Sequence, residues 1–154
     1  MNLKITVGEH ELQEGQVLIC PPRSLFTIKT ERNSAFLEIS VELQEKKMKN
    51  IESGKVFELK NAIDCVDGGI SNVDIVSKEN LKMMLMAFDA GEGLTPHSAP
   101  GDALVVPLEG EAEVLVGEKT FKIKVGEHIV FPKNIIHNVT AVKKFKMLLI
   151  LVID

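Results

Sequence analysis

Two of the four histidines, His97 and His137, stand beside runs of apolar residues that predict strands. Neutral imidazole is the commonest metal ligand in proteins, so two histidines brought together could hold a divalent ion or a polar ligand. His10 and His128 each follow a glutamate beside turn glycines, which is typical of solvated positions. Because forty residues separate His97 from His137, spacing alone does not show that they meet.

Glycine and proline punctuate the sequence around both histidines. Five residues lie between Gly91 and His97, and Gly110 closes the apolar run at 103–108. A second block follows, in which five residues lie between Gly126 and Pro132 and four between Pro132 and His137. Each block thus places one histidine next to a predicted strand.

Together the two blocks resemble the two sequence motifs of the cupin family, which are small antiparallel β-barrels of jelly-roll type. The resemblance covers roughly residues 56–152. It implies that His97 and His137 point into the mouth of the barrel, where cupins bind a divalent metal ion.

The family's metal site is only half present in this sequence. Cupins hold the metal ion with three histidines and one glutamate, in agreement with the three or four protein ligands that a tight divalent site usually needs. The departures from the family pattern are Ala99 for a histidine, Ala103 for the glutamate, Asn134 for a glycine and Ala141 for an asparagine. The resemblance therefore implies either a divalent transition metal (Zn, Fe, Mn or Ni) held by two histidines or a barrel without metal.

Asp102, next to the vacant glutamate position, is a third candidate ligand. Strand side chains alternate between faces, so Asp102 points outward if Ala103 points inward, unless a β-bulge intervenes. Pro107 is unusual inside a paired strand and hints at an irregularity nearby.

The elements that must position these residues are predicted to be strands. The runs at 112–116 and 121–125 flank a turn at Gly117, which is the signal for a hairpin. We expect an all-β fold, an antiparallel jelly-roll β-barrel from about Val56 to Val152. The residues expected in its core are Val105, Leu115, Ile123, Val130, Val139, Leu148 and Ile150.

Residues 1–43 are also predicted to form strands, with a turn at Gly8 and Glu9. The segment repeats the end of the chain. Residues 7–9 match 116–118, and after a two-residue length difference Gly15, Pro21 and Ile39 match Gly126, Pro132 and Ile150. In this match, Phe26 occupies the position that corresponds to His137. The segment thus resembles the second half of another cupin, as in a truncated two-cupin protein, or a strand-rich extension of a single cupin.

Three parts are expected: a partial cupin-like β segment at 1–43, a charged linker at 44–55 and the cupin barrel domain at 56–154. The strands predicted in the first part are 2–7, 17–20, 25–28 and 35–43. Alone, this half-sheet would expose an apolar face and unpaired edges. We therefore expect it to pack on the complete barrel of its own chain or of a partner, in a homodimer.

The composition excludes some classes of partner. With 18 basic and 22 acidic residues, the net charge of −4 provides no basic surface for nucleic acid. No apolar run approaches the roughly eighteen residues of a membrane-spanning helix, and the N-terminus lacks the apolar core of a signal peptide. We expect a cytoplasmic protein with a small-molecule ligand and reduced thiols at Cys20 and Cys65.

Three hypotheses about function remain open, and whether the protein is an enzyme is among the open questions. A binding module would hold a small polar or sugar-like molecule near His97 and His137 without turnover. A metal-dependent enzyme would resemble cupin dioxygenases or isomerases, with the ion acting as a Lewis acid or activating oxygen. A structural or assembly protein would use the barrel as a scaffold. The loss of two metal ligands favours the binding module.

Overall fold

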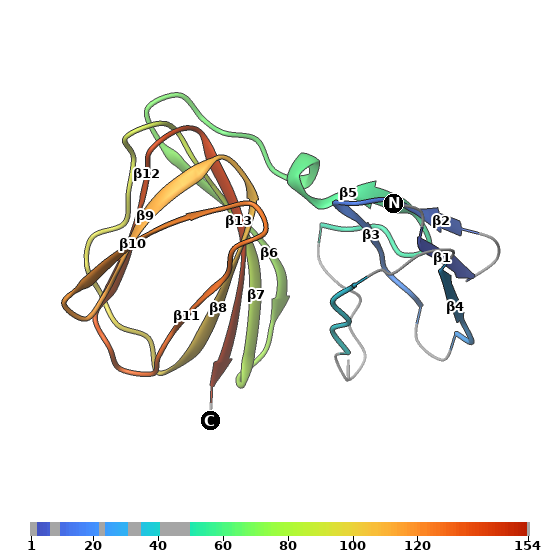
Figure 1. Ribbon diagram of the computed structural model, residues 1–154. Coiled ribbons are helices and arrows are strands. Elements are labelled where there is room, and N and C mark those ends of the chain that lie inside the picture. The colour runs from blue at the N-terminus through green and yellow to red at the C-terminus, as the bar shows by residue number, and fades with distance from the viewer. Residues whose placement is uncertain (1–2, 7–9, 22–23, 31–34, 41–49, 154) are drawn as a thin grey trace. The chain divides into compact units, whose positions relative to one another are not determined.

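The computed structural model describes residues 3–6, 10–21, 24–30, 35–40 and 50–153. Within these residues it contains 13 β-strands and one 3-10 helix. The chain divides into two compact units, Met1–Leu59 and Lys60–Asp154 (Figure 1). No helix of the described residues is long and apolar enough to cross a membrane.

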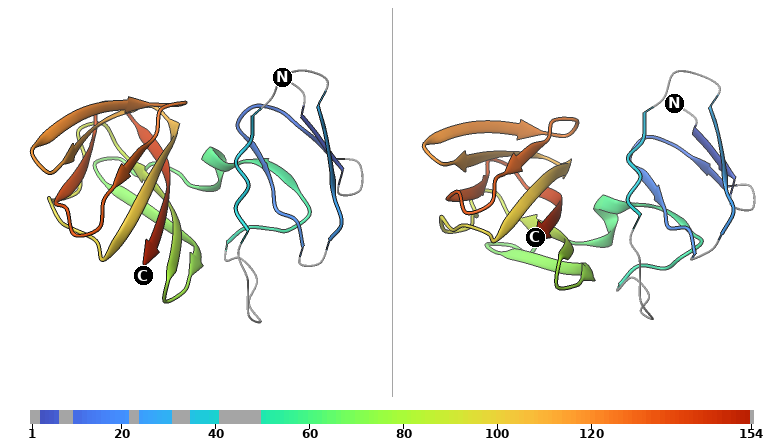
Figure 2. Two further views of the ribbon diagram at one scale, coloured as in Figure 1. Left: turned by 60° about the horizontal axis from the view of Figure 1, so that its bottom comes forward. Right: turned by 90° about the horizontal axis from the view of Figure 1, so that it is seen from below.

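The second unit is a β-barrel made of two antiparallel sheets. A five-stranded sheet has the order β11-β8-β13-β7-β6, and a three-stranded sheet has the order β10-β9-β12. The two sheets face each other and enclose the interior (Figures 1 and 2). Its elements are η1 (Leu59–Ala62), which crosses the unit boundary, and β6 (Ile70–Ser77), β7 (Leu81–Phe88), β8 (Gly101–Glu109), β9 (Glu111–Val116), β10 (Lys119–Lys124), β11 (Ile129–Phe131), β12 (His137–Ala141) and β13 (Phe145–Ile153). The predicted all-β jelly-roll barrel is confirmed.

Period-two alternation assigns residues to the interior. In β8, Ala103 and Val105 are buried while Asp102 between Gly101 and Ala103 is exposed. Each large apolar side chain that is fully buried stabilises the fold by roughly 1.5–3 kcal/mol. The core cluster is Met86, Phe88, Ala103, Val105, Ala112, Val114, Ile123, Phe131, Val139, Ala141, Phe145 and Met147.

Five of the seven predicted core residues are buried, but Leu115 and Val130 are not. Leu115 is half-buried, and Val130 is 49% exposed. The prediction for these two was wrong because it took the other phase of the alternation: their neighbours Val114 and Phe131 point into the core. Leu148 and Ile150 are buried, yet they alternate with the core residue Met147 and so lie on the opposite face of their sheet.

Pro107 does mark an irregularity. The register between β13 and β8 shifts at Lys146 and Met147, where Lys146 pairs with Glu109 and Met147 with Pro107. The missing N–H of Pro107 costs no ladder bond to β11, because β11 pairs with β8 only at residues 103–105. Just beyond this bulge, Gly110 has a φ of 78°, and a Cβ there would lie 1.9 Å from the Lys144 carbonyl oxygen.

Replacing Gly110 with alanine should destabilise the barrel more than replacing Gly126. Both glycines have positive φ, which costs an alanine about 1–2 kcal/mol. Only at Gly110 does the new methyl group also meet backbone, and such overpacking adds about 1–3 kcal/mol. Urea unfolding of the two variants measures the difference, and equal losses of stability would contradict the close approach of Gly110 to Lys144.

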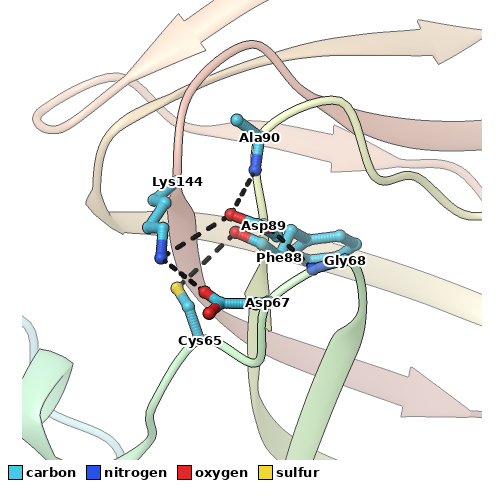
Figure 3. A network of polar contacts seen from close by, with 7 residues as sticks. All are labelled: Cys65, Asp67, Gly68, Phe88, Asp89, Ala90 and Lys144. Atoms are coloured by element: carbon cyan, nitrogen blue, oxygen red, sulfur yellow. Dashed lines mark hydrogen bonds and ion pairs between the residues drawn. The ribbon is translucent and has the colours of Figure 1, made fainter.

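Asp89, at the end of β7, holds the segment that leads into β6 (Figure 3). Its carboxylate accepts hydrogen bonds from the Gly68 amide at 2.7 Å and the Ala90 amide at 2.9 Å. Lys144 lies 3.7 Å from Asp89 and 3.1 Å from Asp67. The two backbone amides, and to a smaller extent Lys144, lower the pKa of Asp89 below 3.8.

Asp89 should therefore make stability depend on pH. Because its pKa is lower in the folded state, its contribution is present above 3.8, and it is lost as the pH falls through the folded-state pKa. Between about pH 6 and about pH 3, the urea midpoint of the wild type should fall more than that of Asp89→Asn.

Asp67→Asn is the matched control for this comparison, because Asp67 is an almost fully exposed partner of the same lysine. It should follow the wild type across the whole range. If the urea midpoint of Asp89→Asn fell with decreasing pH as steeply as that of the wild type, the two backbone amides would not hold the ionised carboxylate.

The first unit repeats the topology of the three-stranded sheet of the barrel. Its strands are β1 (Leu3–Thr6), β2 (His10–Leu12), β3 (Gln16–Leu18), β4 (Thr27–Thr30) and β5 (Val56–Glu58), and one sheet has the order β2-β1-β4. Leu3 pairs with Leu12 and Thr30, as Ala112 pairs with Ile123 and Ala141 in the barrel. The paired residues of the first unit therefore correspond to those of the barrel at the positions that the sequence repeat predicts. The two-residue length difference lies in the hairpin loop.

The turns of the first unit follow the same correspondence. The Gln16 amide donates to the Gln13 carbonyl, as Glu127 does to Lys124. The side chains of Gln16 and Glu127 in turn accept from the amides of Gln13 and Lys124, at 2.8 and 3.2 Å. The Ser24 amide donates to the Pro21 carbonyl, as Ile135 does to Pro132. The first unit is therefore built like the second half of a barrel.

Three details of the first unit differ from the sequence-based expectations. Residues 35–40 belong to no strand, so the strand predicted at 35–43 is wrong there; apolar alternation does not suffice without a partner for the backbone groups. The strand predicted at 25–28 begins only at Thr27. Val56 pairs with Leu18, so β5 adds to β3 and the boundary between units falls after Leu59. The turn at Gly8 and Glu9 and the stretch 41–49 lie outside the described residues.

Candidate functional site

His137 begins β12 and is held on the inner side of the three-stranded sheet. It pairs with Val116 of β9, and its side chain is only 4% exposed. The alternation along β12 places it on the same face as the core residues Val139 and Ala141. His137 thus points into the barrel.

The segment at 91–97 runs along the free edge of β12 and carries His97. Amide–carbonyl bonds join Gly91 to Ala141 and Leu94 to Val139, both at 2.9 Å. At the end of the segment, His97 and His137 exchange two backbone hydrogen bonds, of 3.0 and 2.7 Å. The segment can approach this closely because Gly93 has no side chain. A Cβ at this position would lie only 2.8 Å from the Val139 carbonyl oxygen.

This bridge places the two imidazoles side by side. Directly opposed residues of an antiparallel pair project their side chains from the same face. The ring centroids of His97 and His137 are 4.7 Å apart, with an interplanar angle of 64°. Phe131 stacks on the His137 ring, with the ring centroids 4.4 Å apart and an interplanar angle of 20°. The histidines singled out from sequence therefore meet, whereas their use as metal ligands stays a prediction.

The hydrogen bonds of the rings determine which nitrogen is free. His97 Nδ1 lies 2.9 Å from the Thr95 carbonyl oxygen, and His137 Nδ1 lies 2.9 Å from that of Ile135. A carbonyl oxygen can only accept, so each Nδ1 carries the proton and donates. In the neutral state each Nε2 therefore has a lone pair for an ion or a ligand.

The electrostatic environment favours the neutral form of His137. Burial is the largest cause that lowers its pKa below 6.5, and the nearby His97 lowers it further. The hydrogen bond to the Ile135 carbonyl acts in the opposite direction but is outweighed. His137 is therefore neutral at neutral pH, with Nε2 available as a ligand or hydrogen-bond acceptor.

Asp102 does not join the two histidines. Its side chain lies on the exposed face of β8 and accepts a hydrogen bond of 2.8 Å from the Lys133 amide. It thus holds the turn after Pro132. The β-bulge that would have turned it inward lies elsewhere, at Lys146 and Met147. No group of three or more histidine, cysteine, aspartate or glutamate side chains suited to a metal occurs in the described part of the chain.

The sequence did not identify Phe131 as a residue of the site, and it gave Asn134 only as a departure from the family pattern. Phe131 stacks on His137, and its place directly before Pro132 of the second block was the available signal. Asn134 replaces the motif glycine in the left-handed conformation, with a φ of 62°, and donates its amide to the Ala99 carbonyl at 2.8 Å. Asparagine tolerates this conformation better than most residues, so the turn that leads to His137 is kept.

NMR of the histidine side chains should detect the Nδ1–H tautomer at both His97 and His137. The nitrogen shifts of the neutral rings distinguish the two tautomers, and a pH titration should give His137 a pKa below 6.5. The variant His137→Ala supplies the assignment. An Nε2–H tautomer at either ring would exclude a ligand that needs both Nε2 lone pairs.

Comparison of the sequence with models of known protein families identifies one matching family. The sequence model described as "Cupin domain" matches residues 84–153, a range that contains both histidines. No curated protein sequence matches the chain.

Solved structures with the same fold cover the barrel, and one of them covers both units. A conserved protein of unknown function from Streptococcus pyogenes is 32% identical, with a TM-score of 0.69, and the match covers 71% of this chain and 96% of that one. An RmlC-like cupin protein from Desulfovibrio desulfuricans is 30% identical, with a TM-score of 0.56 and coverage of 64% and 95%. A cupin 2 conserved barrel domain protein from Leptotrichia buccalis is 29% identical, with a TM-score of 0.67 and coverage of 98% and 68%.

Proposed function

The chain belongs to the cupin superfamily, and on this basis we propose that its barrel binds a small polar or sugar-like molecule at His97 and His137, directly or through a divalent metal ion. One observation carries the proposal. Both Nδ1 atoms donate to backbone carbonyls, so two Nε2 lone pairs remain on rings that lie 4.7 Å apart.

The chemistry of the site favours a ligand that donates hydrogen bonds. Neutral imidazoles accept through Nε2 and offer an anion no positive charge. The hydroxyl groups of a sugar-like molecule are suitable donors. Pockets for small molecules typically combine apolar and aromatic walls with few polar groups, and the interior here is apolar with Phe131 beside His137.

The same two nitrogens fit a weakly held transition metal. Metal-binding histidines usually donate their other ring N–H to a carbonyl or carboxylate, and both histidines do so here. Imidazole suits zinc, iron and nickel better than manganese, which prefers oxygen ligands. With two protein ligands, the ion would leave open positions for a ligand and could act as a Lewis acid. The role of this chain's residues would be to fix each ring through its Nδ1 hydrogen bond, which leaves both Nε2 atoms free for the ion.

Binding should require both histidines of the site and neither of the others. Elemental analysis of untagged protein purified without chelators tests for metal, and a melting-temperature screen with sugars and other polyols tests for direct ligands. A ligand at about 100 times its Kd should stabilise the protein by about 2.7 kcal/mol. His97→Ala and His137→Ala should lose the effect, and it should weaken at low pH because protons compete for Nε2.

His128→Ala is the control, since His128 is an exposed loop residue that is predicted to play no part in the site. It should keep any metal and any melting shift of the wild type. If the wild type contains no metal and no polyol changes its melting temperature, the proposed function is wrong.

A further inference from the structure

A row of side chains that begins at the two histidines crosses the inner face of the three-stranded sheet. His137 pairs with Val116, and Val116 pairs with Lys119, the first residue of β10. Directly paired residues of an antiparallel sheet project from the same face, so Lys119 lies on the inner side with His137. Neighbouring strands lie about 4.8 Å apart, which places the backbone of Lys119 about 10 Å from that of His137.

The alternation along β10 supports this orientation of Lys119. Ile123 has the same phase as Lys119 and belongs to the core, with 4% of its side chain exposed. Lys122 has the opposite phase and forms an ion pair of 3.6 Å with Glu113, on the outer face of the sheet. Lys119 is therefore an exposed cation at the histidine end of the inner face, whereas Lys122 lies outside the barrel.

Phe121 lies between Lys119 and Ile123 on the same side of β10. It pairs with the core residue Val114, yet 42% of Phe121 is exposed. An aromatic ring on the inner side of a barrel is usually buried, so this ring leaves a flat apolar surface open beside the lysine. Ligand pockets combine such aromatic surfaces with a few polar groups, and the apolar face of a sugar ring fits against them.

The charge at this end of the barrel interior is positive. Phe131, which stacks on His137, begins a row of the five-stranded sheet. That row consists of Phe131, Ala103, Leu151, Lys82 and Ser77. Apart from the histidines, the only charged residue of each of the two rows is a lysine, Lys119 or Lys82. Neither lysine forms an ion pair with a carboxylate among the described residues, so both positive charges are available to an anion.

We propose that the ligand of the histidine site is an acidic sugar or a related polyhydroxy acid, whose anionic group binds Lys119. This inference rests on the proposed function, in which hydroxyl groups of the ligand donate to Nε2 of the histidines. His137 presents a lone pair, whereas Lys119 presents a positive charge, so one ligand satisfies both with hydroxyl groups at one end and an anion at the other. A lysine ammonium binds carboxylate and phosphate groups alike, and the experiment distinguishes the two.

Titrations of the full chain with matched sets of sugars, followed by NMR at low ionic strength, test the inference. The sets are glucose and galactose, the uronates of both sugars, and the phosphates of both. A uronate or a sugar phosphate should bind about fivefold more tightly than the matching neutral sugar, and the tighter of the two acids identifies the anionic group. Lys119→Gln should abolish this preference, and salt should weaken it in the wild type.

Lys122→Gln is the matched control, because it removes a cation from the outer face of the same strand. It should keep the preference for the acid, and Lys119→Arg should keep it as well. A neutral sugar that binds as tightly as both of its acids, or equal effects of Lys119→Gln and Lys122→Gln, would overturn this inference and leave the proposed function intact. If the wild type binds none of these sugars, neutral or acidic, the proposed function and this inference are both wrong.

Discussion

The reciprocal backbone bridge between His97 and His137 is the constraint on which the site depends. It ends the pairing of the segment at 91–97 with the free edge of β12, and it forces both side chains to the same face of the barrel wall. The bridge in turn depends on Gly93, where any side chain would meet the backbone of β12. A backbone interaction, not an attraction between the imidazoles, therefore brings the two rings together.

The ring hydrogen bonds explain why His137 is tolerated in an apolar interior, whereas His97 is exposed. A buried polar group needs a partner, and Nδ1 of His137 finds one in the Ile135 carbonyl, two residues earlier in the chain. The Nε2 atoms are then the remaining polar groups of the pair. Since burial lowers the pKa of His137 and favours its neutral form, Nε2 of this ring presents a lone pair and not a charge.

The two units show how one local pattern leads to different outcomes. The hairpin, the glycine turn and the register recur in β2-β1-β4, because these features depend on residues close in sequence. In the barrel the same pattern becomes a core with a site, whereas in the first unit it leaves Phe26 exposed. The burial of each face depends on what packs against it, which no local pattern can supply.

The sequence by itself determined the strands, the turns, the barrel fold and the two histidines, because side-chain alternation and glycine turns are local and the motif spacing is fixed by strand length. It did not determine which phase of the alternation faces inward at Val130, or that residues 35–40 would stay outside any strand. It also left open the role of Asp102, which the turn after Pro132 uses. These points, with the distance between the rings, were decided by tertiary structure, since each depends on a backbone or a facing sheet distant in sequence.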